Sequence, residues 1–199
     1  MEIFEYRGVE GLVYAEVTED STTSYTTGTV KELVGVSEIG KATDTSSETH
    51  YYDNAPAIVI NSTGADTISI DASAIPFDTL ADITGQTYDA ATGTLIEGAI
   101  EPKYIALGYK TKKTNGDEVY VWRLKGRFQV PDSTHHTEDD GTDANGQSLV
   151  YTGIQTTHKF TKTGKGAKAV NVDMGKDLID GSHFFDSVQT PDTIVAKQK

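Results

Sequence analysis

The 199-residue chain contains no cysteine, so it has no disulfide framework, no thiolate nucleophile and no Cys-ligated zinc site. Basic residues are few, with 17 Lys and Arg against 30 Asp and Glu, and the net charge is −13. This excludes a general nucleic-acid binder, which needs a basic surface to contact phosphates. No apolar run approaches the roughly 18 residues of a membrane-spanning helix, and the N-terminus lacks the pattern of a standard signal peptide. We therefore expect neither membrane insertion nor secretion by such a signal.

Basic residues are scarcest in the first half of the chain. Residues 1–100 contain 17 acidic side chains and three basic ones, whereas residues 101–199 contain 13 acidic and 14 basic side chains. The whole excess of negative charge therefore lies in the first half. Two interpretations stay open: an acidic solvated face that keeps the protein soluble, or a negative surface with a function.

The residue patterns that are present predict a β protein. Residues 11–17 and 30–39 have the pattern of strands, and residues 57–60 and 67–70 are short β-branched runs. The 28 threonines suit strand surfaces and turns. Residues 104–110 and 118–124 flank Asn115-Gly116, which predicts a β-hairpin with positive φ at both turn positions. A second hairpin is predicted between residues 148–160 and 167–172, across the turn 163–166.

One segment has the periodicity of a helix. From Phe77, side chains suited to a buried face recur at i, i+3, i+4 and i+7. Pro76 stands where a helix begins, and Gly85 is suited to ending it in the left-handed conformation. The sequence therefore predicts one helix over residues 76–84.

Two polar segments match neither pattern. Residues 41–54 are rich in Thr and Ser, and we interpret them as a projecting loop or hairpin. Residues 131–147 are rich in His, Asp and Gly and are interpreted as an acidic loop. No repeat is evident at a period of about 20 to 50 residues, which disfavours a solenoid.

Few residues suggest site chemistry. The run His135-His136-Thr137-Glu138-Asp139-Asp140 is rich in metal-ligand types, but its spacing does not direct two imidazoles at one ion, so we expect no metal site. No Gly-x-Ser-x-Gly elbow is present, and we expect neither enzyme activity nor a cofactor. Four lysines lie around the 163–166 turn and favour a solvated tip or an ion-pairing surface for another copy; they are Lys159, Lys162, Lys165 and Lys168.

Several short motifs occur in a characteristic order along the chain. They are Gly8-Val9-Glu10-Gly11-Leu12-Val13-Tyr14-Ala15, Tyr51-Tyr52-Asp53-Asn54, the predicted helix ending at Gly85, Tyr104-Ile105-Ala106-Leu107-Gly108-Tyr109, Gly116, Trp122 and Phe128-Gln129-Val130-Pro131. In this order and spacing, from about residue 6 to 190, the chain resembles the major tail proteins, or tail tube proteins, of bacteriophages with long non-contractile tails that infect Gram-positive hosts.

The resemblance implies a single tail-tube domain over residues 1–199. Its fold would be mainly β: a two-sheet antiparallel β-sandwich or barrel-like core with one flanking α-helix and long projecting loops. It implies a structural virion protein, made in the host cytoplasm, whose hexameric rings stack into a tube that conducts DNA. The implied partners are other copies of the chain, the tape measure protein, the tail terminator, distal tail proteins and double-stranded DNA that passes without specific binding.

Within this interpretation, Tyr51, Tyr52, Asp53 and Asn54 are the candidate inter-subunit contacts. Tyrosines suit this role because they bury much area at a low cost in side-chain entropy. Two alternatives stay open. One is an extracellular β-sandwich carbohydrate-binding module that uses Tyr or Trp with Asp or Asn. The other is an acidic hydrolase with a carboxylate pair.

Overall fold

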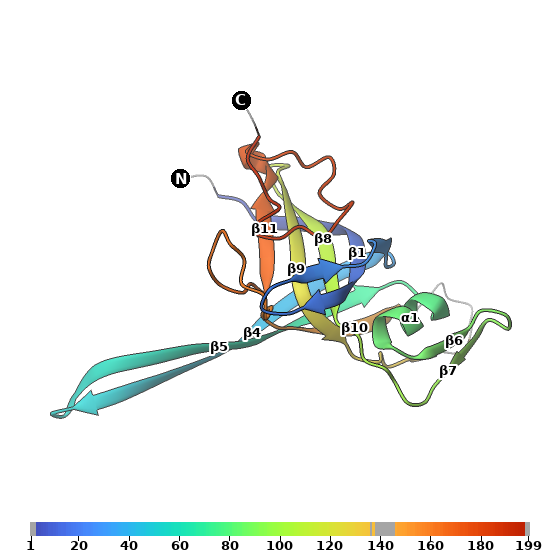
Figure 1. The fold of residues 1–199 in the computed structure, drawn as a ribbon, viewed down its shortest axis with the longest axis horizontal. Coiled ribbons are helices and arrows are strands. Elements are labelled where there is room, and N and C mark those ends of the chain that lie inside the picture. Colours follow the sequence, from blue (N-terminus) through green and yellow to red (C-terminus); the bar gives the residue numbers. More distant parts are fainter. Residues whose placement is uncertain (1–2, 136, 138–145, 198–199) are drawn as a thin grey trace.

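The computed structural model describes residues 3–135, 137 and 146–197. Most regular structure in these residues is β-strand (Figure 1). In chain order the elements are β1 Tyr6–Asp20, β2 Tyr25–Thr27, β3 Lys31–Glu32, β4 Val36–Tyr52, β5 Ala55–Ala72, α1 Phe77–Thr84, β6 Thr87–Asp89, β7 Thr94–Ile96, β8 Ile105–Lys113, β9 Glu118–Phe128, β10 Gln147–Gly153, β11 Ala169–Asp173 and the short 3-10 helix η1 Met174–Lys176.

Nine strands form one antiparallel sheet in the order β2-β1-β8-β9-β10-β5-β4, in which β3 also pairs with β1 and β11 with β9. Strand β9 is central, because β8 occupies one of its edges while β11 and β10 share the other. The sheet curves enough to bring β1 and β4 into contact. Strands β6 and β7 form a separate two-stranded sheet beside α1 (Figure 1). The predicted mainly β, antiparallel fold with one flanking helix is confirmed, and it is consistent with a β-sandwich.

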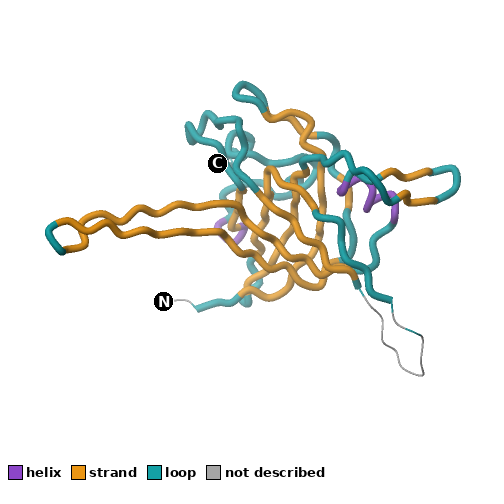
Figure 2. Tube along the Cα trace, turned by 90° about the horizontal axis from the view of Figure 1, so that it is seen from below, coloured by secondary structure: helices purple, strands orange, loops and turns teal. Residues whose placement is uncertain are grey.

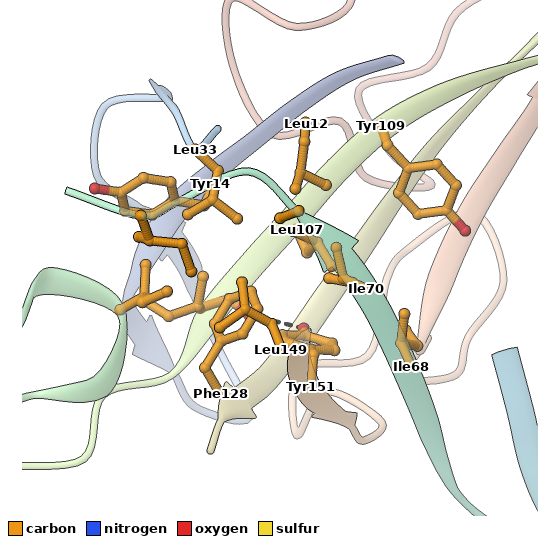
Figure 3. Packing of buried hydrophobic residues seen from close by; sticks show 14 of the residues in the cluster. Leu12, Tyr14, Leu33, Ile68, Ile70, Leu107, Tyr109, Phe128, Leu149 and Tyr151 are labelled. Atoms are coloured by element: carbon orange, nitrogen blue, oxygen red, sulfur yellow. Dashed lines mark hydrogen bonds between the residues drawn. The ribbon is translucent and has the colours of Figure 1, made fainter. Parts of the chain in front are cut away.

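Both faces of the central strands are buried. Successive side chains of a strand point to opposite faces, so one strand contributes to two clusters. On β9, Val119 and Val121 join one cluster, while Trp122 and Leu124 join another. Figure 3 shows the first cluster, where side chains from β1, β5, β8, β9 and β10 meet. The hydroxyl of the buried Tyr151 donates to the carbonyl of Ile105 over 2.8 Å, which satisfies the one polar atom of this ring.

The C-terminal part of the chain covers the other face of the sheet. Trp122 is fully buried there, and its Nε1 donates to the carbonyl of Phe184 over 3.2 Å. Phe160 and Val188 complete the buried set around it. A segment with little regular structure therefore closes the second core.

The helix predicted over 76–84 lies at Phe77–Thr84. It ends at Gly85, which has φ +81° and donates its N–H to the carbonyl of Ala81. A Cβ at position 85 would lie 2.0 Å from the carbonyl oxygen of Glu101, so only glycine fits. The carboxylate of Asp82 on the helix accepts from the hydroxyl of Tyr14 and from Lys31, which fixes α1 to β1 and β3.

The first predicted hairpin is present as β8 and β9, although only Gly116 of its turn has positive φ. The second predicted hairpin is wrong. Strand β10 pairs with β5 and β9, and β11 pairs with β9, while the 163–166 turn closes only one bridge between Phe160 and Lys165. Pairing β10 within the large sheet buries Leu149 and Tyr151 completely, and a local hairpin offers no such burial.

The predicted strand over 30–39 is interrupted after Glu32, because Leu33 turns into the core, and β4 begins at Val36. The predicted runs 57–60 and 67–70 belong to one strand, β5. Residues 41–54 form most of β4 and the turn that leads into β5. Figure 2 shows these two strands continuing as a hairpin well beyond the rest of the molecule.

Candidate assembly surface

The projecting part of the β4–β5 hairpin, residues 45–63, is called the arm here. Strand β10 pairs with β5 only from Asp66 to Ala72, so within the arm the only strand beside β5 in the described chain is β4. All residues from 55 to 64 are exposed. An isolated two-stranded hairpin is marginally stable in water, so the arm depends on its connection to the sheet. Both of its faces and both of its outer edges are open to a partner.

The four predicted contact residues lie together at the tip of the arm. Asp53 and Asn54 have φ of 51° and 65°, positive at both turn positions as in a type I′ turn. Asp and Asn tolerate this region better than other residues with a side chain. Tyr51 and Tyr52 precede the turn and are 64% and 63% exposed. The structure therefore brings two solvent-exposed rings and a carboxylate to one end of the molecule.

The arm also carries apolar side chains that the sequence did not identify as contacts. Ile58, Val59 and Ile60 are 48%, 58% and 53% exposed. Ile58 is opposite His50 and Ile60 is opposite Glu48, so both isoleucines share one face, and Val59 points to the other. The signal available in the sequence was a run of four apolar residues, 57–60, next to a polar Thr- and Ser-rich segment that supplies no buried face.

The base of the arm is fixed by a buried ion cluster around Asp66, called here the root cluster. Its carboxylate lies 3.1 Å from Arg123 Nη1 and 3.1 Å from Lys168 Nζ, and it accepts from Thr43 over 2.9 Å. Lys41 is 3.9 Å away, at the limit of an ion pair. Burial acts to raise the pKa of Asp66, but the hydrogen bonds from Lys168 and Thr43 and the charge of Lys41 outweigh it and hold the pKa below its usual 3.8.

The root cluster joins four parts of the chain. Asp66 is on β5, Thr43 is on β4, Arg123 is on β9, and Lys168 directly precedes β11. Lys168 also donates to the carbonyl of Gly64, the residue that follows the arm. Lys168, one of the four lysines around the 163–166 turn, therefore stabilises the base of the arm. Because the cluster is buried and connected to the central strand, it sets the direction in which the arm leaves the sheet.

A model of the phage tail tube protein family matches residues 35–182. This chain belongs to that family. The matched region contains the whole arm, α1 and the central strands β8 and β9. A search of curated proteins gives no match. Family membership assigns this tail tube protein a structural role in a phage tail, as a component of the virion.

Other features of the tail tube protein bear on the alternatives. Membership of a structural phage tail family disfavours the carbohydrate-binding alternative, and the single Trp122 is fully buried, so it offers no ring for stacking on a sugar. Among the described residues, no group of three or more His, Asp or Glu is arranged to hold a metal ion. His136 and Glu138–Asp140 of the predicted acidic loop lie outside them. No helix in the described ranges is long and apolar enough to cross a membrane.

Proposed function

We propose that this tail tube protein polymerises with itself into rings, six subunits to a ring, and that the rings stack into a hollow tube that conducts DNA out of the capsid. The arm carries this proposal. It is a β-ribbon with exposed apolar residues and open edges, it is held in a fixed direction by the root cluster, and it contributes no side chain to either hydrophobic cluster of the described chain.

Self-assembly follows physically from two surfaces on one chain. A head-to-tail contact that closes by rotation makes a ring, and a second contact along the axis extends the ring into a filament. The arm suits the second contact because a projecting ribbon reaches a neighbour without rearranging the subunit body. We propose Tyr51, Tyr52, Asp53 and Asn54 as inter-subunit contacts in this interface.

The acidic first half supports a role in DNA passage. A negatively charged tube lining repels phosphates, so DNA would slide without specific binding.

In the same proposal the chain has no catalytic step and acts as one tail-tube domain. Its partners are the tape measure protein, the tail terminator and distal tail proteins, and the phage is one with a long non-contractile tail and a Gram-positive host.

The test is negative-stain electron microscopy and sedimentation velocity over a concentration series, with and without tail initiator components. We expect the wild-type protein to form tubes of uniform width. A Tyr51→Ser/Tyr52→Ser variant should stay monomeric with an unchanged melting temperature. The matched control is Ile96→Ser/Leu178→Ser, which also removes two exposed large side chains, 52% and 65% exposed, but away from the arm.

Two results would contradict the proposal. Wild-type protein that stays monomeric even with initiator components would contradict self-assembly into a tube. Tubes formed equally well by the tip variant would contradict the role of the arm tip while leaving self-assembly intact.

A further inference from the structure

A groove of about 610 Å³ opens between β1 and β4, over the face of β8 and β9 that carries the first core cluster. Val9 and Ile39 line it from the two outer strands, and Tyr109 and Val121 line it from the central ones. These side chains belong to the margin of the first hydrophobic cluster or pack against it. The groove is therefore a continuation of the core that the sheet leaves open.

The groove lining carries two cations with different exposure to solvent. Arg123 is only 6% exposed, and its Nη1 is bound to Asp66. Lys41 also lines the groove, and its side chain is 41% exposed. Lys41 is therefore the cation that the groove presents to an acidic group entering from outside.

The strands beside the groove also present unpaired edges. Strand β1 pairs with β8 along one side. On its other side β3 and β2 pair with residues between Val13 and Asp20, and no strand in the described chain pairs with residues 6–11, which border the groove. Strand β4 pairs with β5, and no strand in the described part of the chain pairs with its outer edge. Main-chain donors and acceptors on both sides of the groove are therefore open to an extended segment.

We propose that this groove receives the arm tip of a second copy of the chain, an inference that rests on the proposed function. The tip carries apolar rings and a carboxylate that suit the apolar walls and the cation of the groove. Tyr51 and Tyr52 supply apolar rings for its walls, and the Asp53 carboxylate complements the exposed Lys41 of its lining. Glu38 is the acidic side chain of the groove lining, and it can accept from a tyrosine hydroxyl.

A subunit does not fill its own groove with its own tip. The arm begins in the same strand that borders the groove, and it runs away from the body in both views (Figures 1 and 2). The root cluster fixes this direction. Each copy therefore carries one tip and one unfilled groove, and a tip-to-groove contact is head-to-tail, leaving both ends of a growing chain open for further addition.

The absence of native cysteine gives a direct test by cross-linking. In an Ala55→Cys/Asn171→Cys double variant, one thiol is beside the tip, opposite Tyr52, and the other is at an exposed position in the groove lining. A disulfide forms only when the two Cα atoms approach within about 7 Å. Mild oxidation of assembled tubes should give a ladder of covalent oligomers on denaturing gels. The control Ala55→Cys/Ile96→Cys, with its second thiol on β7, should give no ladder.

A steric variant supplies an independent readout. Asn171→Trp should block assembly without changing the melting temperature, whereas Leu178→Trp, with the same bulk at an exposed position elsewhere, should assemble normally. Tubes from Asn171→Trp, or wild-type-like tubes that cross-link through position 96 and not 171, would overturn the groove assignment and leave the proposed function standing. If wild-type protein forms no tubes even with initiator components, the proposed function itself fails, and the groove assignment fails with it.

Discussion

The two halves of strand β5 contain similar residues in opposite surroundings. From Asp66 to Ala72 every second residue is buried, whereas from Ala55 to Gly64 every residue is exposed. Isoleucines occur in both halves: Ile68 and Ile70 are fully buried, and Ile58 and Ile60 are about half exposed. The same residue type therefore stabilises the subunit in one half and remains available for contacts between subunits in the other. The boundary between the two roles is the root cluster.

The largest effect is expected from removing the charge at this boundary. Asp66→Asn leaves the buried Arg123 without its counter-charge, and breaking a buried ion pair in this way costs about 3–5 kcal/mol in the free energy of unfolding. Urea denaturation would measure the loss. The control is Asp44→Asn on the exposed side of the arm base, which should change stability by no more than about 0.5 kcal/mol. Equal losses in both variants would show that Asp66 has no special role.

A matched pair of substitutions within β5 sharpens the comparison. Ile70→Ala creates a cavity in a filled core and should lower the free energy of unfolding by about 2–5 kcal/mol. Ile60→Ala should lower it by less than about 0.5 kcal/mol, because the side chain is 53% exposed. Only Ile60→Ala should reduce tube formation at a concentration where the folded subunit is unchanged, as measured by sedimentation velocity. A loss of stability in Ile60→Ala similar to that in Ile70→Ala would refute the division of roles.

Acid should weaken the base of the arm. The pKa of Asp66 is held below 3.8 in the folded protein, so its contribution to stability is complete well above that pH and is lost as the pH falls through the lowered value. Asp20, which pairs with Lys125, and Asp82 also have lowered pKa values, and burial opposes the shift in each. The free energy of unfolding should therefore fall as the pH drops below about 4. In Asp66→Asn the fall should be shallower, and an identical slope in both proteins would contradict this assignment.

The smallest effect is expected at the turn. Asn54 has φ 65°, where glycine is less strained, so Asn54→Gly should slow amide exchange in the arm while changing global stability by less than about 0.5 kcal/mol. Asn54→Val, with a β-branched residue at positive φ, should speed exchange in the same amides. Exchange in β8 and β9 should be unchanged in both variants, and an effect there would mean that arm and body are not separable.

Local signals in the sequence predicted local structure. The periodicity from Phe77 and the stop at Gly85 identified the helix, and Asn115-Gly116 identified the β8–β9 hairpin. The partners of β10 and β11 were missed, because long-range pairing follows burial and not the nearest turn. The root cluster was missed for a similar reason: Asp66 is 57 residues from Arg123 and 102 from Lys168, and no spacing rule connects them.

The arm was predicted only in part. The resemblance to known tail proteins marked the Tyr51-Tyr52-Asp53-Asn54 motif as a candidate contact, and the structure places this motif at the arm tip. The exposure of Ile58, Val59 and Ile60 was not foreseen, since an apolar β-branched run usually indicates a buried strand. In the structure these three side chains lie opposite polar residues of β4, and no other described strand covers them. They therefore stay outside the core.

The continuity of β5 has a mechanical consequence. The strand that forms one side of the arm enters the sheet without a hinge, and there it is in register with β10 over seven residue pairs, from Asp66 opposite Gly153 to Ala72 opposite Gln147. Tension applied along the arm therefore loads these pairs in shear, all at once, instead of peeling them one after another. In the proposed assembly, a pull on the arm of a subunit would therefore pass along β5 into the centre of that subunit's sheet.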